Sequence, residues 1–204
     1  IRISQNKIMG YNIYMNFIAQ ASLNFLVNNR TEWLSFLMMV FTYSGGYLMV
    51  IGITFLSALS FYIHRHYQRI LPLLITIGGS AGTVYLLKHL FYRARPVAEA
   101  LYLETSSSFP SGHATMAMAL YGFIFYIIWS YSVKDSRDKH HSLHKFLIIF
   151  LAILILLVGV RRLYLGVHYL SDVLAGYVIG LVWLWISHLI SKLKIWPLQG
   201  NEHL

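Results

Sequence analysis

Three short clusters of ionisable and small polar residues interrupt a sequence that is otherwise strongly apolar. Each cluster falls at the end of a hydrophobic block, and together they contain Lys88, Arg95, Pro96, Pro110, Ser111, Gly112, His113, Arg162, His168 and Asp172. Ionisable side chains are costly in an apolar environment, so residues placed in this way are candidates for function. The residue types indicate a site for an anion with two histidines beside it.

The basic residues of the first and third clusters suit the oxygens of a phosphate group. Lys88 lies about two helical turns before Arg95, so both side chains reach one pocket if the helix continues to the region of Arg95, where Pro96 stops it. Arg162 adds a third cation, and arginine supplies planar, bidentate donors. We therefore expect Lys88, Arg95 and Arg162 to hold a phosphate dianion.

The second cluster opens the next hydrophobic block. The backbone N–H groups of Ser111 and Gly112, and the Ser111 hydroxyl, would then lie at a helix N-terminus, which favours phosphate. His168 and Asp172 are four positions apart, a spacing that places both on one face of a helix. The carboxylate would accept a hydrogen bond from one imidazole nitrogen and leave the other unprotonated as a nucleophile. His113 would remain to protonate the leaving group as a general acid.

Acidic residues and cysteines limit the alternatives for the chemistry. The chain has seven Asp and Glu residues and no cysteine, so thiolate nucleophiles and thiolate metal sites are excluded. Phosphoryl transfer with two metal ions needs several carboxylates that converge, and we place only Asp172 with the basic clusters. We therefore expect no metal and no cofactor, with Lys88, Arg95 and Arg162 neutralising the charge instead.

The three clusters resemble the signature of the type-2 phosphatidic acid phosphatase family, which also includes vanadium haloperoxidases and glucose-6-phosphatases. That pattern is Lys, six residues and Arg-Pro; then Pro-Ser-Gly-His; then Ser-Arg, five residues, His, three residues and Asp. Arg161 stands where the family has a small residue, and a further phosphate or headgroup contact is one interpretation of it. The resemblance implies a six-helix bundle, a phosphohistidine intermediate on His168, His113 as the acid, and an N-terminal helix missing or distorted in this chain.

Composition predicts an all-α, multi-pass membrane bundle that forms a single domain over 1–204. Hydrophobic residues make up 57% and charged residues 11% of the chain, against about 25% charged in soluble domains. The apolar blocks have the length of about 20 residues that a membrane-spanning helix needs. We predict five spans, at 34–63, 70–92, 112–132, 146–163 and 171–191, with the catalytic motifs within 85–175. The first span contains a bend near Gly45-Gly46 and crosses the membrane in its second half, and the N-terminal segment 1–30 contains an interfacial helix over 8–30.

The loops between the spans predict the orientation. Basic segments without a recognisable site lie at 64–69, at 134–145 and in the tail with Lys192 and Lys194, and the positive-inside rule assigns them to the cytoplasm. The candidate site would then face the non-cytoplasmic side of the cytoplasmic (inner) membrane. The net charge of +9 indicates anionic lipid headgroups, and not nucleic acid, as partners. Arg93 is interpreted as an ordinary basic flank, and Gly78, Gly79 and Gly82 as positions of close helix packing.

We therefore predict metal-independent hydrolysis of a lipid phosphate monoester or diphosphate, of the undecaprenyl diphosphate, phosphatidylglycerol phosphate or phosphatidic acid type. Because the 97–109 loop is too short to form a soluble lid, we expect the substrate to enter sideways from the bilayer. Two alternatives stay open: an intramembrane serine hydrolase that uses Ser111 with His168, and a non-enzymatic transporter of phosphate or another anion. The oligomeric state does not follow from the sequence.

Overall fold

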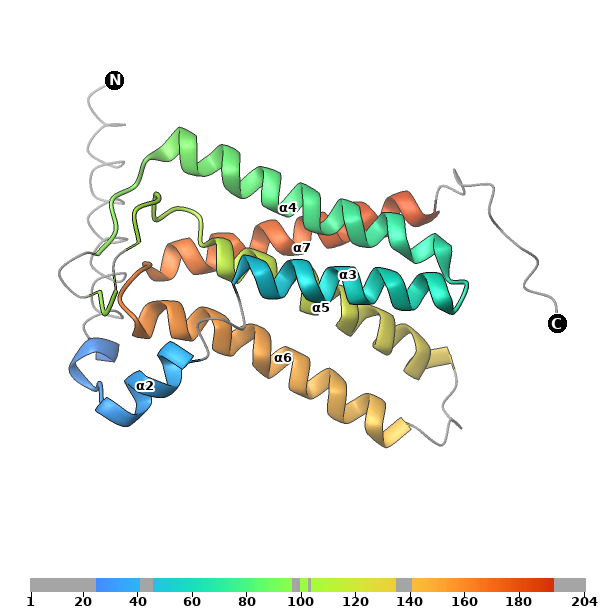
Figure 1. Ribbon diagram of the computed structural model, residues 1–204, viewed down its shortest axis with the longest axis horizontal. Helices are drawn as coiled ribbons and strands as arrows, with labels where there is room; N and C mark the ends of the chain where they lie inside the picture. The colour runs from blue at the N-terminus through green and yellow to red at the C-terminus, as the bar shows by residue number, and fades with distance from the viewer. Residues whose placement is uncertain (1–24, 41–45, 97–99, 103, 135–140, 193–204) are drawn as a thin grey trace, which may run out of the picture.

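Long apolar helices run alongside one another through the protein (Figure 1). The computed structural model describes residues 25–40, 46–96, 100–102, 104–134 and 141–192. Residues 25–28 are helical. The helices that follow are α2 (Glu32–Val40), α3 (Tyr47–Ile63), the short 3-10 helix η2 (Tyr67–Arg69), α4 (Ile70–Phe91), α5 (Gly112–Lys134), α6 (His141–Tyr164) and α7 (Leu170–Lys192). Nothing in these ranges is a β-strand, so the predicted all-α class is confirmed.

Four of the helices are long and apolar enough to cross a membrane. These stretches are Tyr67–Phe91, Gly112–Ser132, His141–Tyr164 and Leu170–Lys192, and α3 is a shorter apolar helix. They agree with the predicted spans, except that α6 begins before the predicted residue 146. Within the predicted span 34–63, the described residues form parts of two helices, α2 and α3, and α3 is its second half. The predicted bend near Gly45-Gly46 adjoins residues 41–45, which lie outside the described part of the chain. Of the predicted interfacial helix at 8–30, residues 8–24 lie outside the described part of the chain.

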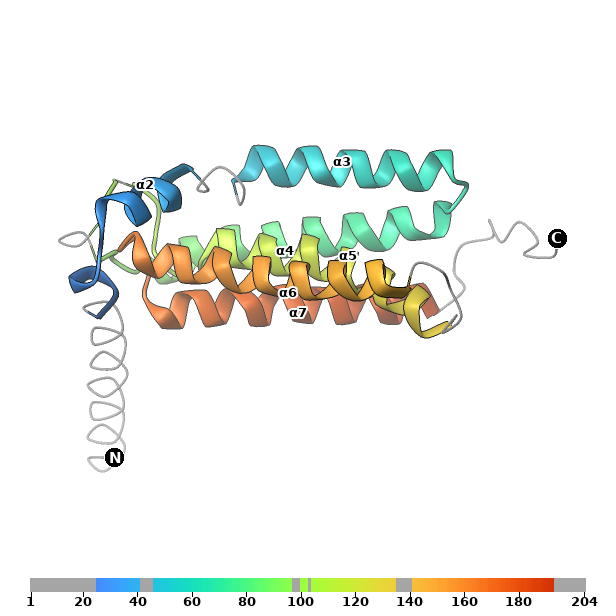
Figure 2. The same ribbon diagram turned by 90° about the horizontal axis from the view of Figure 1, so that it is seen from below.

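Helix α5 lies at the centre of the bundle, and α3 lies farthest to one side (Figure 2). Half of the α5 span is buried, against 22% of each of the other three spans. The α5 side chains Met116, Leu120 and Phe123 form the main core with Leu73 of α4 and Ile155 of α6. Because α5 is surrounded by the other helices, its first turn is held at a defined position inside the protein.

Small residues allow α7 to approach α5 closely beside that first turn. A Cβ atom at Gly176 would lie 2.8 Å from the Ser111 carbonyl oxygen, and one at Gly180 would lie 2.7 Å from Met118 Cβ. Side chains at these positions would therefore push the two helices apart. Of the three glycines of α4, only Gly79 packs closely, against Trp183; nothing lies within 4 Å of a Cβ at Gly78 or Gly82, so the prediction was wrong for those two.

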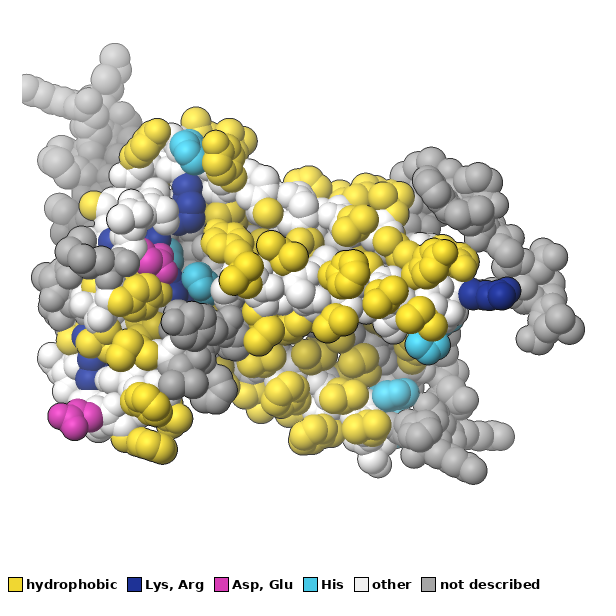
Figure 3. Space-filling view, in the orientation of Figure 1, with side chains coloured by type: hydrophobic (Ala, Val, Ile, Leu, Met, Phe, Trp, Pro, Cys, Tyr) yellow, Lys and Arg dark blue, Asp and Glu magenta, His cyan; other side chains and the backbone are white. Residues whose placement is uncertain are grey.

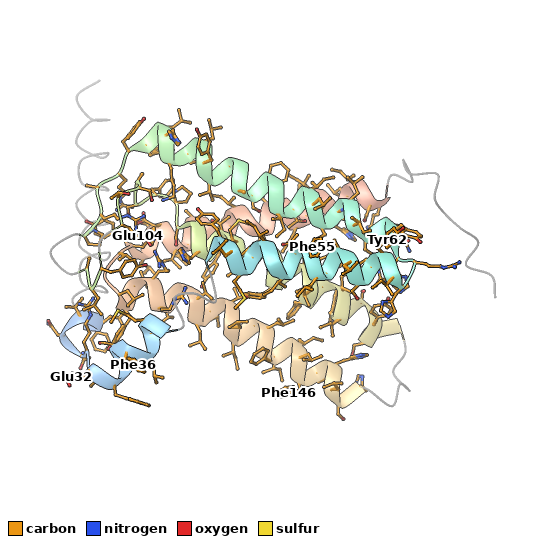
Figure 4. The ribbon with its side chains drawn as sticks, viewed as in Figure 1. Glu32, Phe36, Phe55, Tyr62, Glu104 and Phe146 are labelled. Carbon is orange, nitrogen blue, oxygen red and sulfur yellow. The ribbon has the colours of Figure 1, made fainter. Side chains whose placement is uncertain are left out.

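The outer surface of the bundle is apolar along its length. Hydrophobic side chains cover α3, α4 and α6 on the face shown in Figure 3, whereas most Lys and Arg side chains visible there gather at the end that carries α2. Phe55 of α3 and Phe146 of α6 point outward (Figure 4) and are 66% and 63% exposed. An exposed apolar belt of this length is what the hydrocarbon core of a bilayer requires.

The candidate residues gather at the α2 end of the bundle. There the α4–α5 loop and the α6–α7 loop lie close together (Figure 1), and the Leu101 N–H donates a 3.0 Å hydrogen bond to the Leu165 carbonyl oxygen. The turn that joins α3 to α4, the end of α5 and the start of α6 lie at the opposite end. The structure therefore separates the loops into two groups, as the sequence predicted.

Candidate active site

A cavity of about 320 Å³ opens among the three clusters. Its walls come from α3, α4, the two loops and the first turn of α5, and its lining residues are Tyr47, Lys88, Arg95, Glu104, Thr105, Ser106, Gly112, His113 and His168. Five of the predicted site residues are in this list. The other three, Ser111, Arg162 and Asp172, lie behind the cavity wall and are each 0% exposed.

His168 occupies the turn between α6 and α7. Gly166, at φ 71°, turns the chain after α6, a left-handed conformation that glycine adopts without strain. The turn is held by Arg95, whose Nη1 donates a 2.7 Å hydrogen bond to the Val167 carbonyl oxygen. His168 therefore precedes α7, and the predicted placement of His168 and Asp172 on one helix face was wrong, although the two residues are still neighbours.

The two ring nitrogens of His168 have different surroundings. Nδ1 lies 3.6 Å from Asp172 Oδ2, longer than an ordinary hydrogen bond, and Nε2 lies 3.2 Å from Arg95 Nη1. Because a guanidinium can only donate, Nε2 must carry the lone pair and Nδ1 the proton. Burial lowers the pKa of His168 to about 4; the nearby Asp172 raises this pKa, and Arg162 and Arg95 lower it further. The ring is therefore neutral at physiological pH, with its basic nitrogen at the cavity.

Asp172 is held by three donors, two from the α4–α5 loop and one from the turn before α7. Its Oδ2 accepts hydrogen bonds from the Ser108 hydroxyl and, at 2.9 Å, from the Tyr169 N–H. Tyr169 is the N-cap residue of α7, so its bond to the Asp172 side chain three positions later resembles one half of a capping box. Oδ1 accepts a 2.7 Å bond from Arg93 Nη1, which also donates to Ser171 Oγ at 2.8 Å. Each carboxylate oxygen therefore has a partner, and the carboxylate is fixed beside His168 Nδ1.

Arg93 was not expected in the site. Its guanidinium lies over the Tyr169 ring, 4.4 Å from the centroid, and forms the ion pair with Asp172 while 29% exposed. The interpretation as an ordinary basic flank was therefore wrong. The reason is that α4 ends at Phe91 and Tyr92 takes a left-handed conformation, at φ 41°, so the chain leaves the helix before Pro96 and turns Arg93 toward α7.

Lys88 and Arg95 meet at the loop before α5. Lys88 Nζ donates to the Ser107 carbonyl oxygen and lies 3.4 Å from Ser106 Oγ. Arg95 donates from Nε to the Ser106 carbonyl oxygen at 2.7 Å and from Nη2 to Ser106 Oγ at 3.0 Å. The structure therefore brings both predicted cations to one wall of the cavity, beside His168.

Glu104 is the acid that the sequence argument missed. Its carboxylate pairs with Arg95 Nη2 at 2.6 Å and with Arg162 Nη2, and it accepts a 2.8 Å bond from the Tyr102 hydroxyl. Burial would raise the pKa of Glu104, but Arg162, Arg95 and the Tyr102 bond outweigh burial and lower it to about 2. Glu104 lies on a loop, nine positions before His113, and no spacing signal in the sequence predicts its contacts with the two arginines.

The first turn of α5 presents Gly112 and His113 to the cavity, but not Ser111. The Ser111 N–H donates a 3.0 Å hydrogen bond to the Asp172 carbonyl oxygen, so this group is not available to a phosphate as predicted. The Ser111 hydroxyl oxygen is buried and has no hydrogen-bond partner among the described residues. Ser111 therefore caps α5, its carbonyl oxygen accepting the Thr115 N–H at 3.0 Å, and no hydrogen bond joins its hydroxyl to His168.

Comparison with known proteins decides the family. The family model described as the PAP2 superfamily matches residues 46–196. The chain belongs to the PAP2 superfamily. This chain is 31% identical over 153 residues to phosphatidylglycerophosphatase B of Bacillus subtilis (strain 168). The aligned residues make up 75% of this chain and 73% of the relative.

Two crystal structures share the PAP2 fold described above. The first transmembrane PAP2 type phosphatidylglycerolphosphate phosphatase from Bacillus subtilis superposes with a TM-score of 0.77 at 27% identity, over 94% of each chain. LpxE of Aquifex aeolicus superposes with a TM-score of 0.62 at 24% identity, over 84% of this chain and 94% of that chain. The predictions of an integral membrane PAP2 protein and of a phosphatase are confirmed. Lipid phosphate hydrolysis is the activity that these relatives support.

Arg161, which replaces the small residue of the family pattern, faces the protein interior. It is 2% exposed and does not line the cavity. The structure therefore does not favour its interpretation as a phosphate or headgroup contact of this PAP2 protein.

Proposed function

We propose that this PAP2 protein hydrolyses a lipid phosphate monoester of the phosphatidylglycerophosphate type through a phosphohistidine on His168. The observation that carries the proposal is the Nε2 lone pair of His168, which lies in a cavity whose walls carry Lys88 and Arg95. A neutral imidazole beside fixed cations is suited to attack a phosphate whose negative charge has been neutralised. The Bacillus subtilis relative is a phosphatidylglycerophosphatase, which suggests the lipid class.

In the first proposed step, the substrate phosphate replaces His168 Nε2 as the partner of Arg95 Nη1. The freed Nε2 then attacks the phosphorus atom and forms a P–N bond while the bond from phosphorus to the lipid oxygen breaks. His113, which lines the same cavity, is proposed to take up a proton when the phosphate dianion enters and to give this proton to the leaving oxygen. Asp172 stabilises the positive charge that develops on the His168 ring, and Arg93 and Ser108 hold Asp172 in place. The products of this step are the free lipid alcohol and the phosphohistidine.

In the second proposed step, water attacks the phosphorus atom of the phosphohistidine. The neutral His113 takes a proton from this water, the P–N bond breaks, and its electron pair returns to Nε2. Inorganic phosphate then leaves, and both histidines have regained their starting protonation states. Lys88, Arg95 and the first turn of α5 at Gly112 are the groups proposed to hold the phosphoryl oxygens, together with Arg162.

The proposed location of the site is the non-cytoplasmic face of the cytoplasmic membrane. The opposite end of the bundle carries Arg65, Arg69, Lys145 and Lys192 in or beside its turns, and the positive-inside rule places such residues in the cytoplasm. The lipid substrate would enter sideways from the bilayer. A cysteine-accessibility experiment on Lys192→Cys and Thr105→Cys in intact cells tests this topology, with labelling by an impermeant reagent expected only at position 105.

The decisive assay measures phosphate release in EDTA from phosphatidylglycerophosphate, phosphatidic acid and undecaprenyl diphosphate. We expect turnover of at least one of them to persist in EDTA and to fall by about 10⁴-fold or more in His168→Ala, as for removal of other nucleophiles. Protein quenched in alkali during turnover of a ³²P-labelled lipid should carry an acid-labile label that His168→Ala lacks. Loss of activity in EDTA would rule out the metal-free mechanism. Label retained in His168→Ala would rule out His168 as the nucleophile.

The intramembrane serine hydrolase is the remaining alternative, and the geometry does not favour it. Ser111 lies outside the cavity lining, and its hydroxyl makes no hydrogen bond with His168. A serine nucleophile needs a base within hydrogen-bond reach. Membership of a family of phosphatases likewise favours an enzyme over the anion transporter.

A further inference from the structure

Glu104 occupies the place where the proposed function needs a phosphate. Its two carboxylate oxygens contact Arg95 Nη2, at 2.6 Å, and Arg162 Nη2. These are two of the three cations expected to bind the substrate phosphate. A carboxylate and a phosphate present the same kind of acceptor pair to an arginine, so the chain's own anion already fills the arginine donors that the substrate would use.

Burial shows that Glu104 stands between Arg162 and the cavity. Glu104 lines the cavity and is 22% exposed at its side chain, whereas Arg162 is 0% exposed and absent from the lining. Both nitrogens at the end of the Arg162 side chain are engaged, Nη2 by Glu104 and Nη1 by the Tyr102 hydroxyl. A phosphate therefore reaches Arg162 only after the Glu104 carboxylate moves away. Glu104 itself comes from the α4–α5 loop and not from a helix (Figure 4).

We propose, building on the proposed function, that Glu104 is an internal competitor for the phosphate site. Its carboxylate holds Arg95 and Arg162 when the site is empty, withdraws when a substrate phosphate enters, and returns when the product leaves. The apparent affinity for any phosphate is reduced by the fraction of molecules in which Glu104 still covers the arginines. A lipid substrate has acyl-chain contacts to offset this loss, but inorganic phosphate has none. The consequence is weak binding of the product and its rapid release.

The test compares Glu104→Gln with wild type in the binding of inorganic phosphate and orthovanadate. Glutamine keeps the shape of the side chain and removes its charge. Glu32→Gln is the matched control, because it removes the same charge from exposed α2, away from the cavity (Figure 4). Kd values come from calorimetry on purified protein in detergent micelles, a measurement that does not depend on turnover.

We expect phosphate and vanadate to bind Glu104→Gln about tenfold or more tightly than wild type, and Glu32→Gln to bind them as wild type does. Product inhibition by phosphate should strengthen by the same factor. Affinity that is unchanged or weaker in folded Glu104→Gln overturns the proposal and makes Glu104 a structural tie for the two arginines. A wild-type crystal structure with vanadate provides a second measurement that needs no variant: the Glu104–Arg162 pair should be broken, and an intact pair beside bound vanadate overturns the proposal.

The same experiments distinguish this inference from the proposed function. If wild type binds vanadate and hydrolyses lipid phosphate while Glu104 stays paired with Arg95 and Arg162, the proposal that Glu104 competes with phosphate fails and the proposed function stands. If neither wild type nor Glu104→Gln binds phosphate or vanadate and no lipid phosphate is hydrolysed, the proposed function fails together with the inference.

Discussion

The Arg93–Asp172 ion pair leads to a prediction whose size follows from the structure. Arg93 Nη1 lies 2.7 Å from Asp172 Oδ1, and Arg93 is absent from the residues that line the substrate cavity. It is therefore a positioning residue that acts on the reaction through Asp172. Arg93→Ala leaves Oδ1 of a fully buried carboxylate without this donor, whereas Arg93→Lys keeps the charge but loses the planar fork.

A hydrogen bond to a charged group contributes about 1.5–3 kcal/mol. Because Arg93 is 29% exposed and partly screened by solvent, the lower half of this interval applies. Each 1.4 kcal/mol corresponds to about tenfold in rate, so we expect kcat to fall about 10- to 30-fold in Arg93→Ala and by less in Arg93→Lys. KM should change by less than about threefold, since uniform binding is not affected.

Steady-state kinetics on a lipid phosphate in detergent micelles measures both constants, and Arg95→Ala provides the contrast. Arg95 lines the cavity, so its loss should raise KM as well as lower kcat. Thermal unfolding of each variant identifies general destabilisation. A kcat within twofold of wild type in Arg93→Ala would refute the positioning role, and so would a rise in KM equal to that in Arg95→Ala.

Three further predictions concern the nucleophile, the helix cap and the helix contact behind the site. Burial lowers the pKa of His168 to about 4, and the unprotonated ring is the proposed nucleophile. We therefore expect kcat/KM to persist as pH falls through about 6.5 and to drop only near pH 4; a profile that breaks near 6.5 after correction for ionisation of the substrate phosphate would contradict this. Ser111→Ala should lower kcat by no more than about tenfold, because the hydroxyl makes no hydrogen bond, and wild type should resist fluorophosphonate labelling; labelling or complete inactivation would favour the serine hydrolase. Gly176→Ala should lower the melting temperature and the activity, because its Cβ would lie 2.8 Å from the Ser111 carbonyl oxygen and lower the free energy of unfolding by about 1–3 kcal/mol. Gly78→Ala, with nothing within 4 Å of its Cβ, is the control and should be neutral or stabilising; equal effects of the two substitutions would show that the α5–α7 contact does not matter.

The helical bundle was largely accessible from the sequence because its signal is local. A block of about 20 apolar residues must cross a bilayer as a helix, since backbone groups find no water there. The exception was the α4 terminus, where Tyr92 turns left-handed at φ 41° while Pro96 had been expected to end the helix. This early exit from the helix lets the α4–α5 loop bring Arg93 to Asp172, a contact between a loop residue and a residue of α7.

For the candidate site, the sequence alone determined which chemistry was available. Ordered spacings identified Lys88, Arg95, His113 and His168, and the structure places all four around one cavity. Residue types and spacing sufficed there because a helix or turn carries each residue to the same end of the bundle.

Only the tertiary structure decided how the charges are paired. The Glu104–Arg162 and Arg93–Asp172 pairs join segments far apart in the chain, and the Glu104–Arg95 pair joins two points of one irregular loop. No periodicity relates such residues. The pairs arise because the buried carboxylates and guanidiniums at this end of the bundle must neutralise one another once water is removed, and which partners meet depends on how the two loops fold over the helix ends.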